Sequence, residues 1–256
     1  MPPDQRRGIP HHLIDLVEPT EEYTAAKYVR DAVAAIESIY QRGRWPILVG
    51  GTGLYYRALT RGLFPGPGAD AKMRGRLETV ATRRGVEFLH RMLRRVDAES
   101  ARRILPRDLK RMVRALEVYF LTGRPITDHF ASTVSPLAGL PIVAVALSPP
   151  VSLIAERARK RVDAQFEQGL MDEIRALIAR GVPESARPFG GLVYRQALEL
   201  LHGVRNEADT RELIACENRR YARRQLIWFR KEPNLMWLQT SGESPQALTA
   251  VEALLP

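Results

Sequence analysis

The most constraining feature of the sequence is a short apolar run that leads directly into a glycine-rich turn. Pro46-Ile47-Leu48-Val49 predicts a buried strand of the kind found in a parallel sheet covered on both faces. Gly50-Gly51-Thr52-Gly53 follows and leads into a helix. This order leaves backbone amides and the Thr52 hydroxyl at the carboxyl edge of the strand, where α/β folds bind ligands. The alternative is a tight turn in which the glycines relieve crowding and Thr52 caps the helix.

Two segments rich in proline and glycine divide the chain. Phe64–Ala69 reads Phe-Pro-Gly-Pro-Gly-Ala and is incompatible with the interior of a helix or strand. Leu137–Pro141 is the second segment, and it precedes the apolar run Ile142–Leu147, which predicts another buried strand. The pattern between the two segments is helical throughout.

Helices dominate the rest of the chain. Thr24 is placed to cap a helix with one apolar face, and Gly43 is placed to end it. A last strand over 235–238 and a closing helix are expected. One or two strands before a long helical tail are too few for an α/β sheet, so we expect strands of the sheet to be missing from this sequence. Four further helices are predicted, over 151–169, 170–180, 192–202 and 209–231.

The charge balance favours a polyanionic partner. Basic residues number 39 against 29 acidic ones, which gives a net charge of +10. Of the basic residues 34 are arginines, whose planar group binds phosphate through two hydrogen bonds. A GC-rich genome produces the same arginine excess without any function, so both interpretations stay open.

Several classes of protein are disfavoured. No run approaches the ~18 to 20 apolar residues of a membrane span, and the start of the chain, 1–8, is polar, so we expect a cytoplasmic protein without membrane association. Cys216 is the single cysteine and forms no internal disulfide. Because no Cys or His pairs have zinc-ligand spacing, we expect no structural metal.

The helix that starts after Asp108 has an apolar and a basic side. Arg111 and Arg114 are three residues apart, so their guanidinium groups share a face that can straddle neighbouring phosphates. The alternative is a solvated helix surface. The expected apolar side contains Leu109, Met112, Val113, Leu116 and Phe120, and the basic side contains Lys110, Arg111 and Arg114.

Two further clusters of cations stand out. Like charges one turn apart in Arg157–Arg161 destabilise an isolated helix, so this segment predicts a bound phosphate or diphosphate, unless Glu156, Asp163 and Glu167 compensate internally. Near the end, arginines alternate with aromatic rings, which suits contact with RNA, although such rings more often lie in a core. This cluster contains Arg219, Arg220, Arg223, Arg224 and Arg230 with Tyr221, Trp228 and Phe229.

Several motifs, in order, resemble those of tRNA dimethylallyltransferases, also called tRNA isopentenyltransferases. The first ones are Pro10-His11-His12-Leu13-Ile14-Asp15, Tyr23-Thr24-Ala25-Ala26 with Arg30-Asp31-Ala32, and Pro46-Ile47-Leu48-Val49-Gly50-Gly51-Thr52-Gly53-Leu54-Tyr55. The later ones are Asp108-Leu109-Lys110-Arg111, Arg114-Ala115-Leu116-Glu117-Val118, Tyr194-Arg195-Gln196, Arg223-Arg224-Gln225 and Trp228-Phe229-Arg230. The resemblance spans essentially the whole chain.

The resemblance implies transfer of a dimethylallyl group from dimethylallyl diphosphate to N6 of adenosine 37 in tRNAs that read UNN codons, assisted by Mg²⁺. The implied partners are the tRNA anticodon stem-loop and dimethylallyl diphosphate, and we expect a monomer. The implied fold is α/β, a P-loop-NTPase-like parallel sheet core with an inserted helical domain and a helical C-terminal region. The core is expected over 1–64 and 140–256, and the insertion over 65–139.

The resemblance also assigns site residues. Arg161 is expected to hold the diphosphate and help it leave, and Thr52 is expected to serve in catalysis and to contact tRNA. The other implied tRNA contacts are Arg74, Lys110, Arg111, Met112, Val113, Arg114, Gly190, Gly191, Leu192, Val193, Tyr194, Arg195, Arg223, Arg224, Gln225, Leu226, Ile227, Trp228, Phe229 and Arg230.

The chain departs from the family in two places. Members begin with a strand, a Walker-type phosphate loop and an aspartate that acts as general base, and we expect this N-terminal segment to be lacking here. The family also usually has a glycine directly before the tyrosine where this chain has Val193.

The missing segment leaves three hypotheses for the function. The first is a transferase whose start is cut or misassigned, so that 1–256 alone has poor turnover, exposes a sheet edge and aggregates. The second is a catalytically inactive tRNA-binding remnant. The third is transfer of the prenyl group to free adenine nucleotides, which the arginine-rich helix disfavours because a small nucleotide needs no long phosphate-binding surface.

Overall fold

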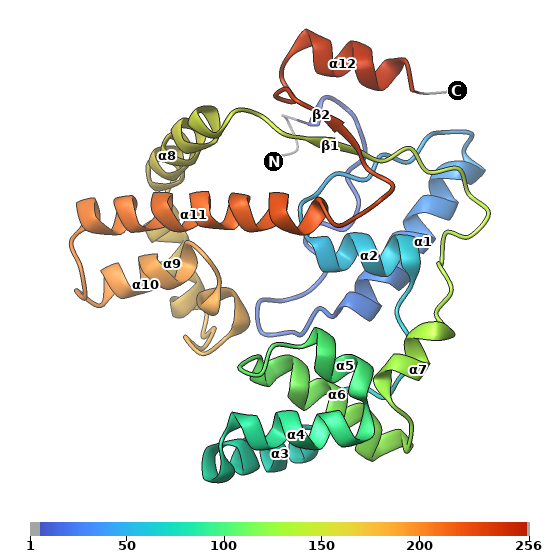
Figure 1. The fold of residues 1–256 in the computed structure, drawn as a ribbon. Helices are drawn as coiled ribbons and strands as arrows, with labels where there is room; N and C mark the ends of the chain where they lie inside the picture. Colours follow the sequence, from blue (N-terminus) through green and yellow to red (C-terminus); the bar gives the residue numbers. More distant parts are fainter. Residues whose placement is uncertain (1–5, 255–256) are drawn as a thin grey trace. The chain divides into compact units, whose positions relative to one another are not determined.

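A computed structural model describes residues 6–254; the polar start, 1–5, and residues 255–256 lie outside the described part. The chain divides into two compact units, Arg57–Ala138 and the remainder, Met1–Tyr56 with Gly139–Pro256 (Figure 1). The smaller unit starts before the expected boundary at 65. The reason is that Leu59 is fully buried and its carbonyl accepts a hydrogen bond from Ser135 Oγ, 3.4 Å away.

The smaller unit is helical, as the pattern between the two proline- and glycine-rich segments predicts. Leu89, Leu93, Met112 and Leu116 are fully buried in its core. Phe120 was expected on the same face, but it is 45% exposed, so the apolar side of this helix is narrower than predicted. The helices of this unit are the end of α2 (Gly53–Arg61), α3 (Ala71–Arg84), α4 (Val86–Val96), α5 (Ala98–Arg103), α6 (Leu109–Thr122) and α7 (Ile126–Ala131).

The helices predicted for the larger unit are confirmed with small shifts in their ends. Thr24 caps α1 as expected, since its side chain accepts a hydrogen bond from Lys27 N, and Gly43 follows the helix at φ +66°. Ile174, Ala197 and Ile214 are buried in the core of this unit. Its elements are α1 (Ala25–Gln41), α8 (Val151–Glu167), α9 (Leu170–Ala179), the 3₁₀ turn η2 (Arg187–Gly190), α10 (Tyr194–Leu201), α11 (Glu207–Phe229) and α12 (Pro245–Glu252).

Residues 6–254 form a sheet of two short parallel strands, β1 (Val145–Leu147) and β2 (Met236–Leu238). Ala146 is paired with Trp237. The strand expected over 142–147 is therefore shorter, because its first half has no ladder partner among the described residues.

The prediction of a strand at Pro46–Val49 was wrong. This segment forms no ladder with any described residue, and a strand without a neighbour leaves its backbone groups to water. Ile47 is 84% exposed and Val49 is 88% exposed, so neither side chain is covered as the prediction required.

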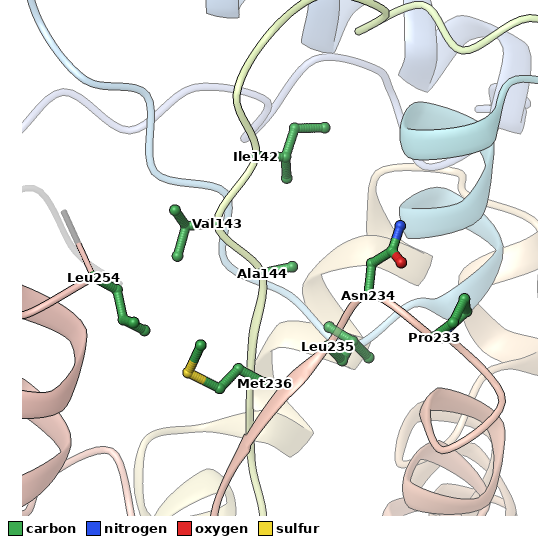
Figure 2. Close-up of a pocket in the computed structure, with 8 residues that line it drawn as sticks. All are labelled: Ile142, Val143, Ala144, Pro233, Asn234, Leu235, Met236 and Leu254. Atoms are coloured by element: carbon green, nitrogen blue, oxygen red, sulfur yellow. The ribbon is translucent and has the colours of Figure 1, made fainter. Parts of the chain in front are cut away.

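A mostly apolar pocket of about 450 Å³ lies beside the starts of the two strands. Figure 2 shows Met236 and Leu254 pointing toward each other on one side of the pocket, with Asn234 on the other. None of the residues that line it belongs to the predicted site. The lining consists of Ile142, Val143, Ala144, Pro233, Asn234, Leu235, Met236 and Leu254.

Candidate functional site

The glycine turn lies directly against α11, although the two are far apart in sequence (Figure 1). Gln225 Nε2 donates a hydrogen bond of 2.8 Å to the Gly51 carbonyl. A Cβ atom at Gly53 would lie 2.4 Å from ring carbons of Trp228, a distance that real Cβ atoms do not show. Gly51 and Gly53 therefore relieve crowding against Gln225 and Trp228 of α11, whereas a Cβ atom at Gly50 would meet no atom within 4 Å.

Thr52 is exposed at the first turn of α2. It stands at the N-cap position of α2, where its carbonyl accepts a hydrogen bond from Tyr56 N at 3.1 Å, and its hydroxyl makes no hydrogen bond to another described residue. The N-terminus of a helix carries partial positive charge and unsatisfied amides, which favour an anionic group. The structure thus leaves one hydroxyl available where the turn meets α11.

Four arginines of α11 and its C-cap, which we call the arginine ridge, are exposed and have no acidic partner within 4.0 Å among residues 6–254. Their spacing of three, four and seven residues puts them on one face of the helix. Arg219 differs because it lies 3.7 Å from Glu212. The ridge consists of Arg220, Arg223, Arg224 and Arg230.

The aromatic residues of α11 divide between packing and exposure. Phe229 packs edge-on against Trp228 and Tyr56, with centroid distances of 4.9 and 5.6 Å. Tyr221 is 40% exposed, and the Arg224 guanidinium lies 5.7 Å from its ring centroid. Three further predicted tRNA contacts lie between Arg224 and Trp228 in the sequence. Of these, Gln225 and Leu226 are half-buried, and Ile227 is 48% exposed.

The positive charge of the segment Arg157–Arg161 in α8 is only partly balanced by carboxylates of the same helix. Glu156 pairs with Lys160 at 2.7 Å, but Asp163 pairs with Arg211 and not with the cluster. Arg157 lies 2.6 Å from Glu243, and Arg159 lies 3.8 Å from Glu212. Arg161 is exposed and lacks an acidic partner in the described part of the chain, so its charge is available to a ligand.

The loop before α10 has a strained backbone. Val193 has φ +79° and ψ −59°, which a β-branched residue rarely adopts. This geometry explains why a glycine suits the position before the tyrosine. Gly190, Gly191 and Leu192 precede it, and of these Gly190 is exposed whereas the other two are half-buried. Val193 itself is buried, so its side chain offers no surface to tRNA.

Carboxylates hold the polar side chains that follow Val193. Tyr194 OH donates to Glu173 Oε1 at 2.7 Å, and burial together with this carboxylate raises the pKa of Tyr194 to about 12. Arg195 is exposed, and its Nη2 lies 3.0 and 3.2 Å from the two oxygens of Glu217 on α11. The same glutamate accepts a short hydrogen bond from Gln196, which is fully buried.

In the smaller unit two predicted contacts meet at one carboxylate. Glu117 is fully buried and accepts hydrogen bonds from Arg74 Nε at 2.8 Å, Arg114 Nη1 at 2.7 Å and Asp70 N at 2.7 Å. Arg114 also donates to the Pro67 carbonyl at 2.8 Å. The Arg114 guanidinium is thus turned toward the protein, which corrects the expectation that it straddles phosphates with Arg111.

The other predicted contacts on α6 differ in exposure. Lys110 and Arg111 are exposed, and Arg111 Nε lies 3.4 Å from Asp108. Met112 and Val113 are buried in the core, so their side chains cannot touch tRNA. Of the tRNA contacts predicted in this part of α6, only the exposed cations Lys110 and Arg111 therefore remain.

Sequence reasoning missed the roles of Glu117 and Glu217. Each lies on a helix close to a buried apolar residue of the packed face: Val113 precedes Glu117 by four residues in α6, and Ile214 precedes Glu217 by three residues in α11. A charged residue on an apolar face is rarely buried unless it is paired. A glutamate on the apolar face of a predicted helix was therefore the feature of the sequence that could have indicated these ion pairs.

Residues 6–254 contain neither a cluster of metal ligands nor a membrane-spanning helix. No group of three or more His, Cys, Asp or Glu is arranged to hold a metal, so the described residues supply no ready cage for Mg²⁺. No described helix has both the length and the apolar character needed to cross a membrane.

The structure resembles solved tRNA-modifying enzymes. A tRNA isopentenylpyrophosphate transferase from Bacillus halodurans matches with a TM-score of 0.68 and 32% identity, over 99% of this chain and 80% of that one. A eukaryotic dimethylallyltransferase solved while acting on tRNA matches with a TM-score of 0.78, over 99% of this chain and 65% of that one, and at 24% identity it shows the fold alone.

Sequence comparison identifies the family. A tRNA dimethylallyltransferase from Solibacter usitatus is 43% identical over 96% of this chain and 80% of its own length. Another from Thermobifida fusca is 43% identical over 92% of this chain and 73% of its own length. The family model for IPP transferase matches residues 1–232. The chain therefore belongs to the IPP transferase family, a family of prenyltransferases that includes the tRNA dimethylallyltransferases.

Proposed function

We propose that the chain transfers a dimethylallyl group from dimethylallyl diphosphate to N6 of adenosine 37 in tRNAs that read UNN codons. One observation carries the proposal. The Gly50–Gly53 turn is packed on Gln225 and Trp228, so the exposed Thr52 hydroxyl lies beside the helix that bears the arginine ridge. A hydroxyl beside a helix whose exposed arginines have no acidic partner among residues 6–254 suits a reaction between a diphosphate and a polynucleotide.

On the tRNA side, we assign the arginine ridge and Arg195 to the backbone of the anticodon stem-loop. The ridge arginines have no acidic partner among residues 6–254, and Arg195 stays exposed although Glu217 holds its Nη2, so these cations can replace counterions on phosphate, which makes binding strongly salt-dependent. Tyr221 is the exposed ring beside the ridge and is available for stacking on an unpaired base. Lys110 and Arg111 of the smaller unit are proposed as further backbone contacts.

In the proposed reaction, the N6 nitrogen attacks C1 of the dimethylallyl group while the bond from C1 to the diphosphate oxygen breaks. The diphosphate leaves with the bonding electron pair, and N6 releases one proton to water. Arg161 is assigned to the charge that develops on the leaving diphosphate, because its own charge has no internal partner among residues 6–254. Thr52 is assigned as a hydrogen-bond donor to the substrate.

Magnesium is proposed as the ion that neutralises the diphosphate. It commonly binds through substrate phosphates and water rather than through a dedicated cage of side chains. This preference is compatible with the lack of a metal-binding cluster in the described residues.

For the fold, we propose that β1 and β2 belong to a parallel sheet of the P-loop type, and that 65–139 is a helical insertion into it. The parallel pairing of two strands that are far apart in sequence supports the sheet. The compact helical unit Arg57–Ala138 supports the insertion.

The test is prenyl transfer by the purified chain to an anticodon stem-loop that carries A36-A37-A38, with a G37 stem-loop as the negative acceptor. We expect Arg161→Ala to lower kcat/KM about a hundredfold, the usual cost of losing one charge-stabilising group. Arg159→Ala is the matched control, because Arg159 is exposed on the same helix and already faces Glu212. It should change kcat/KM little.

The outcomes separate the competing hypotheses. Transfer only by a form extended through any upstream in-frame coding sequence would establish a transferase whose start is cut, whereas salt-dependent binding of the stem-loop without transfer by either form would favour a tRNA-binding protein that lacks catalysis. Transfer to AMP in preference to the stem-loop would favour an enzyme that acts on free nucleotides. Failure to bind the stem-loop at low salt would refute the proposal.

A further inference from the structure

The loop Gly190–Arg195 is tied to α11 by a continuous hydrogen-bonded chain. Val193 N donates to Gln196 Oε1 at 2.8 Å, Gln196 Nε2 donates to Glu217, and Arg195 donates to both oxygens of Glu217. Gln196 is fully buried, and the Glu217 side chain is 24% exposed. A single carboxylate on α11 therefore fixes both the backbone of the loop and its exposed cation.

The strain in the loop shows why such a tie is needed. A β-branched residue at φ +79° stays in that conformation only when its surroundings over-determine it. The Gln196 carboxamide does this by accepting the Val193 N–H, and Glu217 holds the carboxamide in turn. Loss of the Glu217 charge weakens the hold on Gln196 and leaves Arg195 without a partner.

We infer that Glu217 is a positioning residue for tRNA binding, which acts through Gln196 and Arg195. It fixes the loop so that Arg195 and the arginine ridge present one cationic surface. This inference rests on the proposed function, because it assumes that the surface binds the anticodon stem-loop.

The sign of the effect distinguishes positioning from simple electrostatics. Removing a negative charge near a polyanion makes the surface more cationic, so electrostatics alone predicts tighter binding. Positioning predicts weaker binding, because Arg195 loses the partner that orients it. Glu212 offers a matched control, since it lies on the same helix, faces Arg159 and Arg219 at 3.8 and 3.7 Å, and is 61% exposed.

The experiment measures the Kd of the full chain for the anticodon stem-loop at several salt concentrations. We expect Glu217→Gln to weaken binding about tenfold, as when a hydrogen bond to a charged group is lost. The slope of log Kd against log salt should also fall by about 0.7 to 0.9, which corresponds to one phosphate contact. Glu212→Gln should bind as tightly as the wild type or slightly more tightly, with an unchanged slope.

A double-mutant cycle separates positioning from a general loss of structure. Because Glu217 acts through Arg195, Glu217→Gln should add little to the effect of Arg195→Ala. Gln196→Glu, which places a second carboxylate against Glu217, should weaken binding in the same way and provides an independent variant if Glu217→Gln does not fold.

Unchanged or tighter binding by Glu217→Gln, or fully additive effects with Arg195→Ala, would overturn the inference while leaving the proposed function intact. Absence of binding by the wild type would overturn both. These two failures are distinguishable because only the second affects the unmodified chain.

Discussion

The buried carboxylate of Glu117 allows the most direct test of the structure of the smaller unit. It accepts hydrogen bonds from Arg74, Arg114 and the Asp70 amide, and it is fully buried. Glu117→Gln keeps one acceptor oxygen but removes the charge that both arginines face. Breaking a buried ion pair by neutralising one partner costs about 3 to 5 kcal/mol.

We expect the low end of that range, about 3 kcal/mol. The side chains of Arg74 and Arg114 are 38% and 30% exposed, so water partly solvates the charges that remain. Glu99→Gln is the matched control in the same unit, because Glu99 is 52% exposed and pairs with Arg103 at 3.3 Å. Exposed pairs contribute about 0 to 1 kcal/mol, so this control should be nearly neutral.

Amide hydrogen exchange in the full chain measures this difference locally. A loss of about 3 kcal/mol raises the exchange rate of the most protected amides of α3 and α6 about a hundredfold. The amides of α8 and α11 in the larger unit serve as the internal reference. Equal protection of α6 in Glu117→Gln and Glu99→Gln would refute the reasoning.

The same carboxylate predicts a pH dependence. Burial raises the pKa of Glu117, but the hydrogen bonds from Arg74, Arg114 and the Asp70 amide lower it more, so its pKa lies below the ordinary value of 4.5. A lowered pKa in the folded state means that the stabilisation is complete above pH 4.5 and is lost as the pH falls through the folded pKa. Protection of α6 should fall with acid in the wild type, and this component should be missing in Glu117→Gln.

Two further substitutions test the glycine turn and the strained loop. Gly53→Ala should destabilise the larger unit by about 1 to 3 kcal/mol and weaken binding of the stem-loop, because its Cβ would lie 2.4 Å from the Trp228 ring. Gly50→Ala meets no atom within 4 Å and should leave unfolding and binding unchanged; equal effects would contradict the packing described. Val193→Gly relieves backbone strain while it removes a buried side chain, so we expect a change in unfolding free energy within about 1 kcal/mol of zero. Val182→Gly removes an equally buried side chain without such relief and should cost about 2 kcal/mol or more, and an equal cost at both positions in denaturant unfolding would argue against strain.

Local patterns in the sequence predicted the helices well. Thr24 and Asp108 both cap helices by accepting a backbone N–H three residues later, as the capping prediction requires for Thr24. These contacts depend only on residues that are close in sequence, so pattern and propensity suffice to find them.

Patterns failed where the outcome depended on distant neighbours. Pro46–Val49 has the composition of a buried strand, but no described segment pairs with it, and Ile47 and Val49 are exposed. Phe120 has the right spacing for the packed face of α6 and is nevertheless 45% exposed. A strand requires a ladder partner and a buried side chain requires a covering element, and neither is encoded in the segment itself.

The sequence by itself determined the helical division of the chain, the excess of arginine and the motifs that place it among the IPP transferases. Only the tertiary structure decided which cations are held by carboxylates and which are not. Glu117 meets Arg74 across 43 residues of sequence and Glu217 meets Arg195 across 22, whereas the arginine ridge and Arg161 have no acidic partner among the described residues. The physical reason is that an ion pair forms where packing brings two charges within a few ångströms, and the packing of helices depends on the whole core rather than on any local pattern.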